Sequence, residues 1–247
     1  MAKKNFKLVI EYDGSAYCGW QIQPNGPTIQ DQIESALRRM TCSKVNLIGS
    51  GRTDAGVHAL GQSANFSCDT NIDAQAFQNG LNSLLPDDIV IRSCSRVDEN
   101  FHARFDAKAK IYRYHILNSP LPAAIGRQYQ WWIRSPLDAY AMAEAASHLV
   151  GKKDFKAFEA SGSPRAHTIR QVMRADIRRE NQIDVVFEIQ AEGFLRYMVR
   201  NITGTLVEVG KGNMDPEDML SILASQDRAR AGMTAPAQGL CLVEVLY

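Results

Sequence analysis

The order of apolar and polar positions predicts strands and helices in alternation through the first hundred residues. Apolar side chains recur at helical spacing after Thr28, which is suited to cap a helix. A second helix follows Asp73 and ends at Pro86. Alternating or apolar runs bounded by turn residues predict four strands. These strands cover residues 6–13, 44–50, 62–68 and 88–97.

The same order of elements is predicted again in the remainder of the chain. Strands are expected over residues 107–117, 168–180, 182–191 and 240–246. Helices are expected over residues 137–150 and 194–209, and a further helix begins at Asp215–Pro216, because proline favours the first helical position.

Each half therefore follows the order β-α-β-β-α-β, which is the ferredoxin-like arrangement of an antiparallel sheet with helices on one side. We expect an α+β protein of two ferredoxin-like halves whose sheets meet at a central cleft. The predicted division places residues 1–105 in the first half and residues 106–247 in the second.

Composition leaves this picture unchanged and narrows the class of protein. The chain has 247 residues, of which 45% are hydrophobic and 22% charged, as in ordinary globular proteins. No signal peptide or membrane-spanning segment is expected. Five dispersed cysteines, with no Cys-x-x-Cys or His-Glu-x-x-His pattern, argue against a disulfide framework and a zinc site. These features predict a cytoplasmic protein.

Charge is distributed unevenly along the chain. The formal net charge is only +1, but residues 101–200 carry 16 Lys and Arg against 10 Asp and Glu. A basic middle segment favours a polyanionic partner, and a solvated face is the plainer alternative. Within residues 152–179, Arg174, Asp176 and Arg178 alternate and are expected to share one face of a strand. Arg165 belongs to the same basic segment.

A glycine-rich stretch, residues 49–62, carries one carboxylate and one arginine between two apolar runs. Its glycines predict a tight loop in which backbone can approach a ligand. Asp54 lies at its centre, two residues from Arg52. An aspartate in such a turn usually bonds its own backbone, so spacing alone favours a turn residue over a catalyst.

Two further segments combine cations with aromatic or apolar side chains. Residues 101–114 alternate cationic and aromatic side chains, a pattern that suits a nucleic acid whose phosphates bind the cations and whose bases stack on the rings. In that segment we expect Tyr114 to pack in the core. For Tyr112 the residues alone do not decide between a core position and a site position. In the second segment, Arg196 and Arg200 lie four apart on one face of the predicted helix and need acidic or phosphate partners.

These residues resemble the tRNA pseudouridine synthase A family. The loop Gly51-Arg-Thr-Asp-Ala-Gly-Val-His58 is similar to its signature, and further family blocks follow in order over the whole chain. These blocks are Tyr12-Asp-Gly14, Gly19-Trp-Gln21, Phe101-His-Ala-Arg104, Tyr112-Arg-Tyr114, Phe194-Leu-x-x-Met-Val-Arg200 and Thr234-Ala-Pro-Ala-x-Gly-Leu240.

The resemblance implies conversion of uridine to pseudouridine at positions 38, 39 and 40 of the tRNA anticodon stem-loop. It further implies a homodimer that uses no cofactor or metal. Asp54 corresponds to the catalytic carboxylate, Arg200 to its arginine partner and Tyr112 to the base-stacking tyrosine. Arg52 corresponds to the arginine that helps to extract the nucleotide. Among the remaining residues, Arg196 and His58 are expected to contact the substrate.

The residue types suit that reaction without fixing its first step. A carboxylate can attack C1′ or C6, or remove the C2′ proton. A nearby arginine keeps the carboxylate charged, and an aromatic ring receives a base that has left the stack. Two other classes fit less well: an RNA-binding module, which has no use for Asp54, and a hydrolase, which usually needs a second carboxylate or a metal. The chain's histidines have no Ser or Cys partner in a catalytic motif.

Overall fold

The computed structural model describes residues 3–160, 162 and 167–247, so the predicted Arg165 lies outside the described residues. The chain divides into two compact units. The first unit holds the residues up to Lys108 together with Leu242–Tyr247, and the second holds Ala109–Cys241. That the chain forms two domains divided between residues 105 and 106 stays a prediction.

The first unit contains the predicted order of strands and helices. Its elements are β1 (Lys4–Tyr12), α1 (Ile29–Thr41), β2 (Ile48–Gly49), β3 (His58–Cys68), α2 (Ala74–Leu84) and β4 (Ile89–Val97). Strand β1 lies between β3 and β4 and is antiparallel to both, and β2 pairs with β3. The chain's last strand, β10 (Leu240–Leu246), also lies beside β3.

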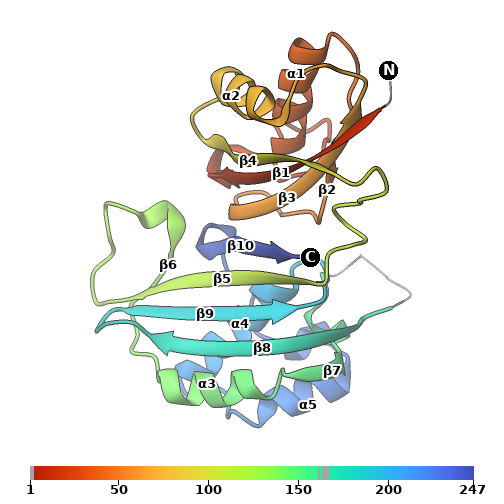
Figure 1. Cartoon of the computed structure of the whole chain (residues 1–247). Coiled ribbons are helices and arrows are strands. Elements are labelled where there is room, and N and C mark those ends of the chain that lie inside the picture. Colours follow the sequence, from red (N-terminus) through yellow and green to blue (C-terminus); the bar gives the residue numbers. More distant parts are fainter. Residues whose placement is uncertain (1–2, 161, 163–166) are drawn as a thin grey trace. The chain divides into compact units, whose positions relative to one another are not determined.

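Helices α1 and α2 cover one face of this sheet (Figure 1). The core beneath them includes an aromatic cluster of Phe6, Phe66 and Phe77, whose ring centroids lie 4.9–5.4 Å apart. Both predicted caps are confirmed, since Thr28 accepts a hydrogen bond from the Asp31 amide and Asp73 one from the Ala76 amide. Side-chain capping satisfies amides that the first helical turn leaves without partners.

Strands β2 and β3 differ most from the prediction. Residues 44–47 are not strand, because the Leu47 amide donates to the Glu34 carboxylate and the Leu47 carbonyl accepts from Gln30, both on α1. That backbone is therefore occupied by a helix and cannot join the ladder. Strand β3 begins at His58 rather than residue 62, so the glycine-rich loop is shorter than predicted.

The second unit repeats the pattern with additions. Its elements are β5 (Ala109–Asn118), β6 (Trp131–Ile133), α3 (Ala139–Ser147), β7 (Gly151–Asp154), β8 (Ile169–Arg179), β9 (Asp184–Ala191), α4 (Met198–Gly210) and α5 (Asp218–Ser225). Strands β5, β9, β8 and β7 form an antiparallel sheet in that order, and β6 pairs in parallel with β5. Helices α3, α4 and α5 lie on one side of this sheet (Figure 1).

Several boundaries in the second unit also differ from the prediction. The sequence did not predict β6 or β7, which have only three and four residues and no alternation to mark them. Helix α4 begins at Met198 rather than at residue 194, because Tyr197 adopts a left-handed backbone with φ of 63°. Helix α5 begins at Asp218, after a turn in which the Asp218 amide bonds the Asp215 carbonyl.

A β-bulge in β8 determines which side chains share the face of the sheet opposite the helices. Val172 pairs with Ala191 on the helix-covered side, and the register then shifts before Arg174 pairs with Gln190. This shift moves Arg174, Asp176 and Arg178 together onto the open face, because an inserted residue reverses the alternation. The three residues therefore share a face, as predicted.

Glu188 of β9 lies among these arginines and is only 5% exposed. Arg113 donates to it from two nitrogens, at 2.7 and 3.1 Å, and Arg174 donates to its other oxygen. Burial alone would raise the pKa of Glu188. The hydrogen bond from Arg113 and the charges of Arg113, Arg174 and Arg178 outweigh that effect and hold the pKa below its ordinary value of 4.5.

We predict that Glu188→Gln lowers the free energy of unfolding by about 1–3 kcal/mol at pH 7. A carboxyl whose pKa is depressed by folding stabilises the protein above its unfolded pKa, and that contribution is lost as pH falls through the folded pKa. The difference from wild type should therefore shrink below pH 4.5. Urea unfolding between pH 7 and pH 3 measures it. Glu144→Gln on the exposed side of α3 is the control, and a difference that stays constant with pH would contradict the prediction.

Candidate active site

The loop that carries Asp54 joins β2 to β3 and turns sharply at its end. The Val57 amide donates to the Asp54 carbonyl at 3.2 Å, and Gly56 adopts a left-handed φ of 76°. Asp54 is half-buried, whereas Arg52 is exposed two residues before it. Asp54 is thus a turn residue through its backbone.

The segment that follows β1 holds this loop in place. The Trp20 amide donates to the Thr53 carbonyl at 3.1 Å, and the hydroxyls of Tyr12 and Thr53 lie 2.8 Å apart. A β-carbon at Gly19 would lie 2.6 Å from the Thr53 carbonyl oxygen, and one at Gly14 only 2.1 Å from the Val57 carbonyl oxygen. Side chains at these two glycines would therefore push the loop away.

His58 forms a second connection between the same two segments. Its side chain is buried, and its Nδ1 accepts a hydrogen bond from the Gly14 amide at 3.1 Å. The Asp13 carboxylate also lies 3.1 Å from that nitrogen. His58 therefore connects the first residue of β3 to the turn that follows β1.

Polar contacts from β3 fix the beginning of the loop. The Ser50 hydroxyl donates to Gln62 Oε1 at 2.7 Å, and Gln62 Nε2 donates to the Gly51 carbonyl at 3.2 Å. The Ser50 amide also donates to the Ser63 carbonyl at 2.7 Å. Because both ends of the loop are anchored, the backbone at Asp54 has little freedom.

Tyr112 and Tyr114 lie in the second unit, on the helix-covered side of β5. Tyr114 is fully buried and its hydroxyl donates to the Pro236 carbonyl, which confirms the predicted core position. Tyr112 is 8% exposed and packs edge-on against Phe194, with ring centroids 5.0 Å apart. Phe194 thus fixes the plane of the Tyr112 ring.

Arg196 and Arg200 also lie in the second unit, around the ring of Tyr197. They do not share a helical face as predicted, because Arg196 precedes the start of α4. Instead the two guanidinium carbons lie 4.9 and 4.8 Å from the Tyr197 ring centroid, a cation–π arrangement. Arg200 Nε donates to the Ala235 carbonyl at 2.8 Å, so it is held more firmly than the exposed Arg196.

The structure thus groups the predicted residues by unit. Asp54, Arg52 and His58 share one loop region, and the remaining three residues, Tyr112, Arg196 and Arg200, belong to the second unit. Sequence reasoning did not single out the anchoring residues of the loop. Their signal was present in the Tyr12-Asp-Gly14 and Gly19-Trp-Gln21 blocks, which it used only for the resemblance.

The described part of the chain shows neither a cluster of metal ligands nor a membrane-spanning helix. Among the described residues, no group of three or more His, Cys, Asp and Glu side chains is arranged to hold a metal ion. In the same part of the chain, no helix combines the length and apolar character that a membrane crossing requires.

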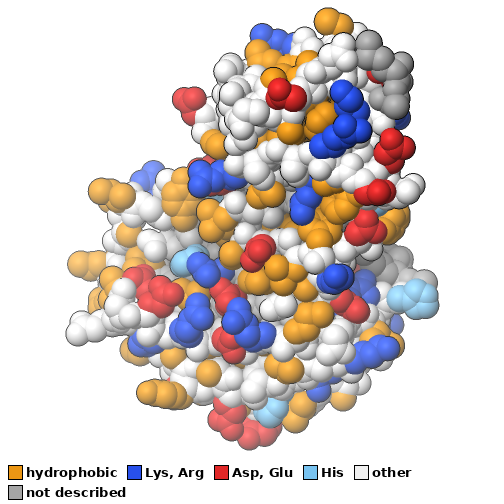
Figure 2. Space-filling view, in the orientation of Figure 1, with side chains coloured by type: hydrophobic (Ala, Val, Ile, Leu, Met, Phe, Trp, Pro, Cys, Tyr) orange, Lys and Arg blue, Asp and Glu red, His pale blue; other side chains and the backbone are white. Residues whose placement is uncertain are grey.

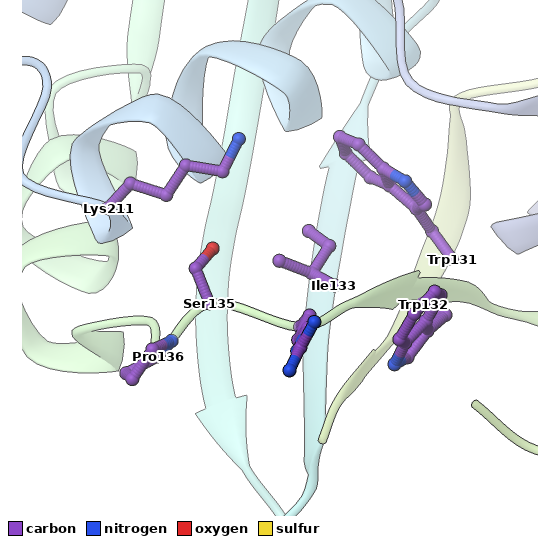
Figure 3. A pocket seen from close by; sticks show the side chains of 7 residues that line it. Trp131, Trp132, Ile133, Ser135, Pro136 and Lys211 are labelled. Atoms are coloured by element: carbon purple, nitrogen blue, oxygen red, sulfur yellow. The ribbon is translucent and has the colours of Figure 1, made fainter. Parts of the chain in front are cut away.

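A separate open cavity of about 610 Å³ lies within the second unit. Trp131 and Lys211 line opposite sides of it, with Ile133 and Ser135 between them (Figure 3). None of the predicted site residues lines this cavity, so it is distinct from the residues described above.

Comparison with known proteins places these features in a wider group. A sequence model of the family described as "tRNA pseudouridine synthase" matches residues 8–106 and 145–247. A protein named tRNA pseudouridine synthase A from Acetivibrio thermocellus is 50% identical over 244 residues, covering 99% of this chain and all of that protein. One of the same name from Geotalea daltonii is 48% identical, with the same coverage.

Solved structures give a looser likeness. A chain in the crystal structure of a Cbf5–Nop10–Gar1 complex has a TM-score of 0.38 and 12% identity, and the match covers 96% of this chain and 57% of that chain. The assignment of a family is supported by the two full-length relatives from Acetivibrio thermocellus and Geotalea daltonii, and not by this likeness.

We predict that His58→Ala speeds hydrogen exchange of the Gly14 amide by about tenfold, because the variant cannot form the buried bond to Nδ1. His58→Asn should restore most of the protection, since its amide oxygen can occupy the position of Nδ1. Exchange measured by NMR at pH 7 tests both variants, with His148→Ala in the second unit as control. Equal protection in wild type and His58→Ala would contradict the assigned contact.

Proposed function

We propose, because the chain belongs to the tRNA pseudouridine synthase family, that it isomerises uridine to pseudouridine in tRNA. The observation that carries this proposal is the full-length similarity to relatives of that name, together with a family match that includes the whole Gly51–His58 loop. The family match also favours an isomerase over the two alternatives considered from the sequence, a non-catalytic RNA-binding module and a hydrolase.

The reaction breaks the N-glycosidic bond of uridine, turns the base and joins C5 to C1′. The C5 proton is released and N1 takes up a proton, so the product has the same composition as the substrate. No oxidant or reductant takes part, so acid–base or nucleophilic groups of the protein suffice.

Asp54 is the proposed catalytic carboxylate. Its support is the anchored loop described above, since a group held in one geometry avoids the cost of ordering it during the reaction. Arg52 is exposed beside it and is proposed to help extract the nucleotide. His58 was expected to contact the substrate. Because its side chain is buried, it is proposed to act by positioning the Asp54 loop.

Tyr112 is proposed to receive the extracted base, and Arg200 to pair with the catalytic aspartate. The support for Tyr112 is a ring fixed by Phe194, which suits a flat platform for a base. Its position lies between the two stretches that the family model matches, so it depends on the Tyr112-Arg-Tyr114 resemblance. Arg196, exposed at the surface, is proposed to contact the RNA.

The finer parts of the proposal concern substrate and assembly. Following the resemblance, we propose that the modified uridines are at positions 38, 39 and 40, and that the enzyme works as a cytoplasmic homodimer without metal or cofactor. Mapping pseudouridine in tRNA from cells with and without the protein tests the positions. Sedimentation velocity of the purified protein tests the dimer.

Asp54→Asn should lower the rate of pseudouridine formation by about 10²–10⁴-fold, because the amide cannot act as nucleophile or base. Binding of tRNA should persist, since the turn depends on the Asp54 backbone. Tritium released from C5-labelled uridine in tRNA measures the rate, and filter binding measures affinity. Asp87→Asn, an exposed site in the same unit, is the control. Near-normal release from Asp54→Asn would remove Asp54 from the mechanism.

Tyr112→Phe should lower turnover by about tenfold while changing tRNA affinity much less, because it removes a hydroxyl and keeps the stacking ring. Single-turnover rates at saturating enzyme, compared with dissociation constants, separate the two effects. Tyr140→Phe, an exposed tyrosine on α3, is the control. Equal reductions in rate and affinity would argue against a role for the hydroxyl.

A further inference from the structure

In the second unit, the face of the sheet opposite the helices carries a cluster of charged side chains that the proposed reaction does not use. We call it the Glu188 cluster, and its members are Arg113 on β5, Glu188 on β9, and Arg174, Asp176 and Arg178 on β8. Cationic and acidic side chains lie next to one another over these three strands in Figure 2. The helices of the unit lie on the other side of the sheet (Figure 1).

The arginines of the cluster differ in how many of their donors the protein occupies. Arg113 uses two nitrogens on Glu188, and Arg174 uses one on Glu188 and lies 3.3 Å from Asp176. Arg178 Nη2 lies 3.9 Å from Glu188, which is too far for a hydrogen bond. A guanidinium offers five N–H donors, so within the described part of the chain Arg178 donates none of them and Arg174 donates only part of its own.

The β-bulge in β8 brings Arg174 and Arg178 to this face. Without the register shift after Val172, Arg174 would alternate onto the helix-covered side, where Val172 is fully buried. Bulges often serve to re-aim a side chain at a functional site. Glu188 then fixes the Arg174 guanidinium at the sheet surface, where its side chain is 44% exposed.

Charge and geometry together indicate the kind of ligand. Three arginines face two carboxylates in the cluster, which leaves one positive charge on an exposed surface. Planar guanidiniums bind phosphate oxygens through paired N–H donors, and a phosphodiester carries one negative charge. A purely structural network would neutralise its charges, whereas this cluster keeps an excess of one positive charge and pairs Arg178 with Glu188 only at 3.9 Å.

We propose that Arg178 and Arg174 bind a backbone phosphate of the RNA, on the face of the second sheet opposite the one that carries Tyr112. The inference rests on the proposed function, since that function supplies RNA as the ligand. It adds a phosphate-binding position that orients the substrate through its backbone, as such contacts generally do.

The decisive measurement is the salt dependence of binding to unmodified tRNA. Each arginine bound to a phosphate releases condensed counterions, so removing one such arginine lowers the magnitude of the slope of log K against log salt by about 0.7–0.9. Arg178→Gln should show that fall and weaker binding, with a melting temperature close to wild type, because its half-exposed pair with Glu188 contributes little. Arg178→Lys should keep the slope, since it keeps the charge.

Arg92→Gln is the matched control, because Arg92 is also a strand arginine with a single carboxylate partner, Glu11 at 3.4 Å, in the first unit. Wild-type slopes in both Arg178→Gln and Arg174→Gln would overturn the inference. A changed oligomeric state with an unchanged slope would also overturn it, and would assign this face to protein contact.

Failure of the inference and failure of the proposed function are distinguishable. If the wild-type protein forms no pseudouridine but Arg178→Gln still lowers the slope, the function fails and the phosphate site stands. If the wild type forms pseudouridine and the slope is unchanged, the reverse holds.

Discussion

The absence of side chains at Gly14 and Gly19 permits the contact on which the candidate site depends. At both positions backbone of the segment after β1 lies directly against backbone of the Asp54 loop, closer than any β-carbon allows. This close approach brings the Trp20 amide to the Thr53 carbonyl and the Gly14 amide to His58. A reactive carboxylate on a free loop would have to be ordered each time it acts, and here folding has already ordered its backbone.

The second unit uses the same device to position Arg200. A β-carbon at Gly204 would lie 1.7 Å from the Met233 carbonyl oxygen, so the segment after α5 lies directly on α4. Two hydrogen bonds then join Arg200 and Ala235, one between their backbones and one from the guanidinium. In both units a glycine contact between two segments therefore determines where a charged side chain stands.

Local signals in the sequence predicted most elements of this fold, because a helix cap or an apolar period is contained in a few residues. Thr28 and Asp73 act as predicted, and the order of elements in the first unit is confirmed. The errors arose where residues far away in the sequence, or a backbone conformation, determine the boundary of an element. Leu47 leaves the sheet because α1 binds its backbone. The predicted helix starts later, at Met198, because Tyr197 adopts a left-handed conformation that no pattern of apolar positions marks.

The same division between local and distant causes explains what was predicted of the charges. Alternation placed Arg174, Asp176 and Arg178 on one face, but only the bulge decides that this is the open face, and only the register of β9 places Glu188 among them. The sequence could thus predict that these three charged residues share a face. It could not predict that they surround the carboxylate of Glu188. The buried carboxylate of Glu188 holds the guanidiniums of Arg113 and Arg174 in place beside Arg178, and cations held in this way can orient a polyanion as well as attract it.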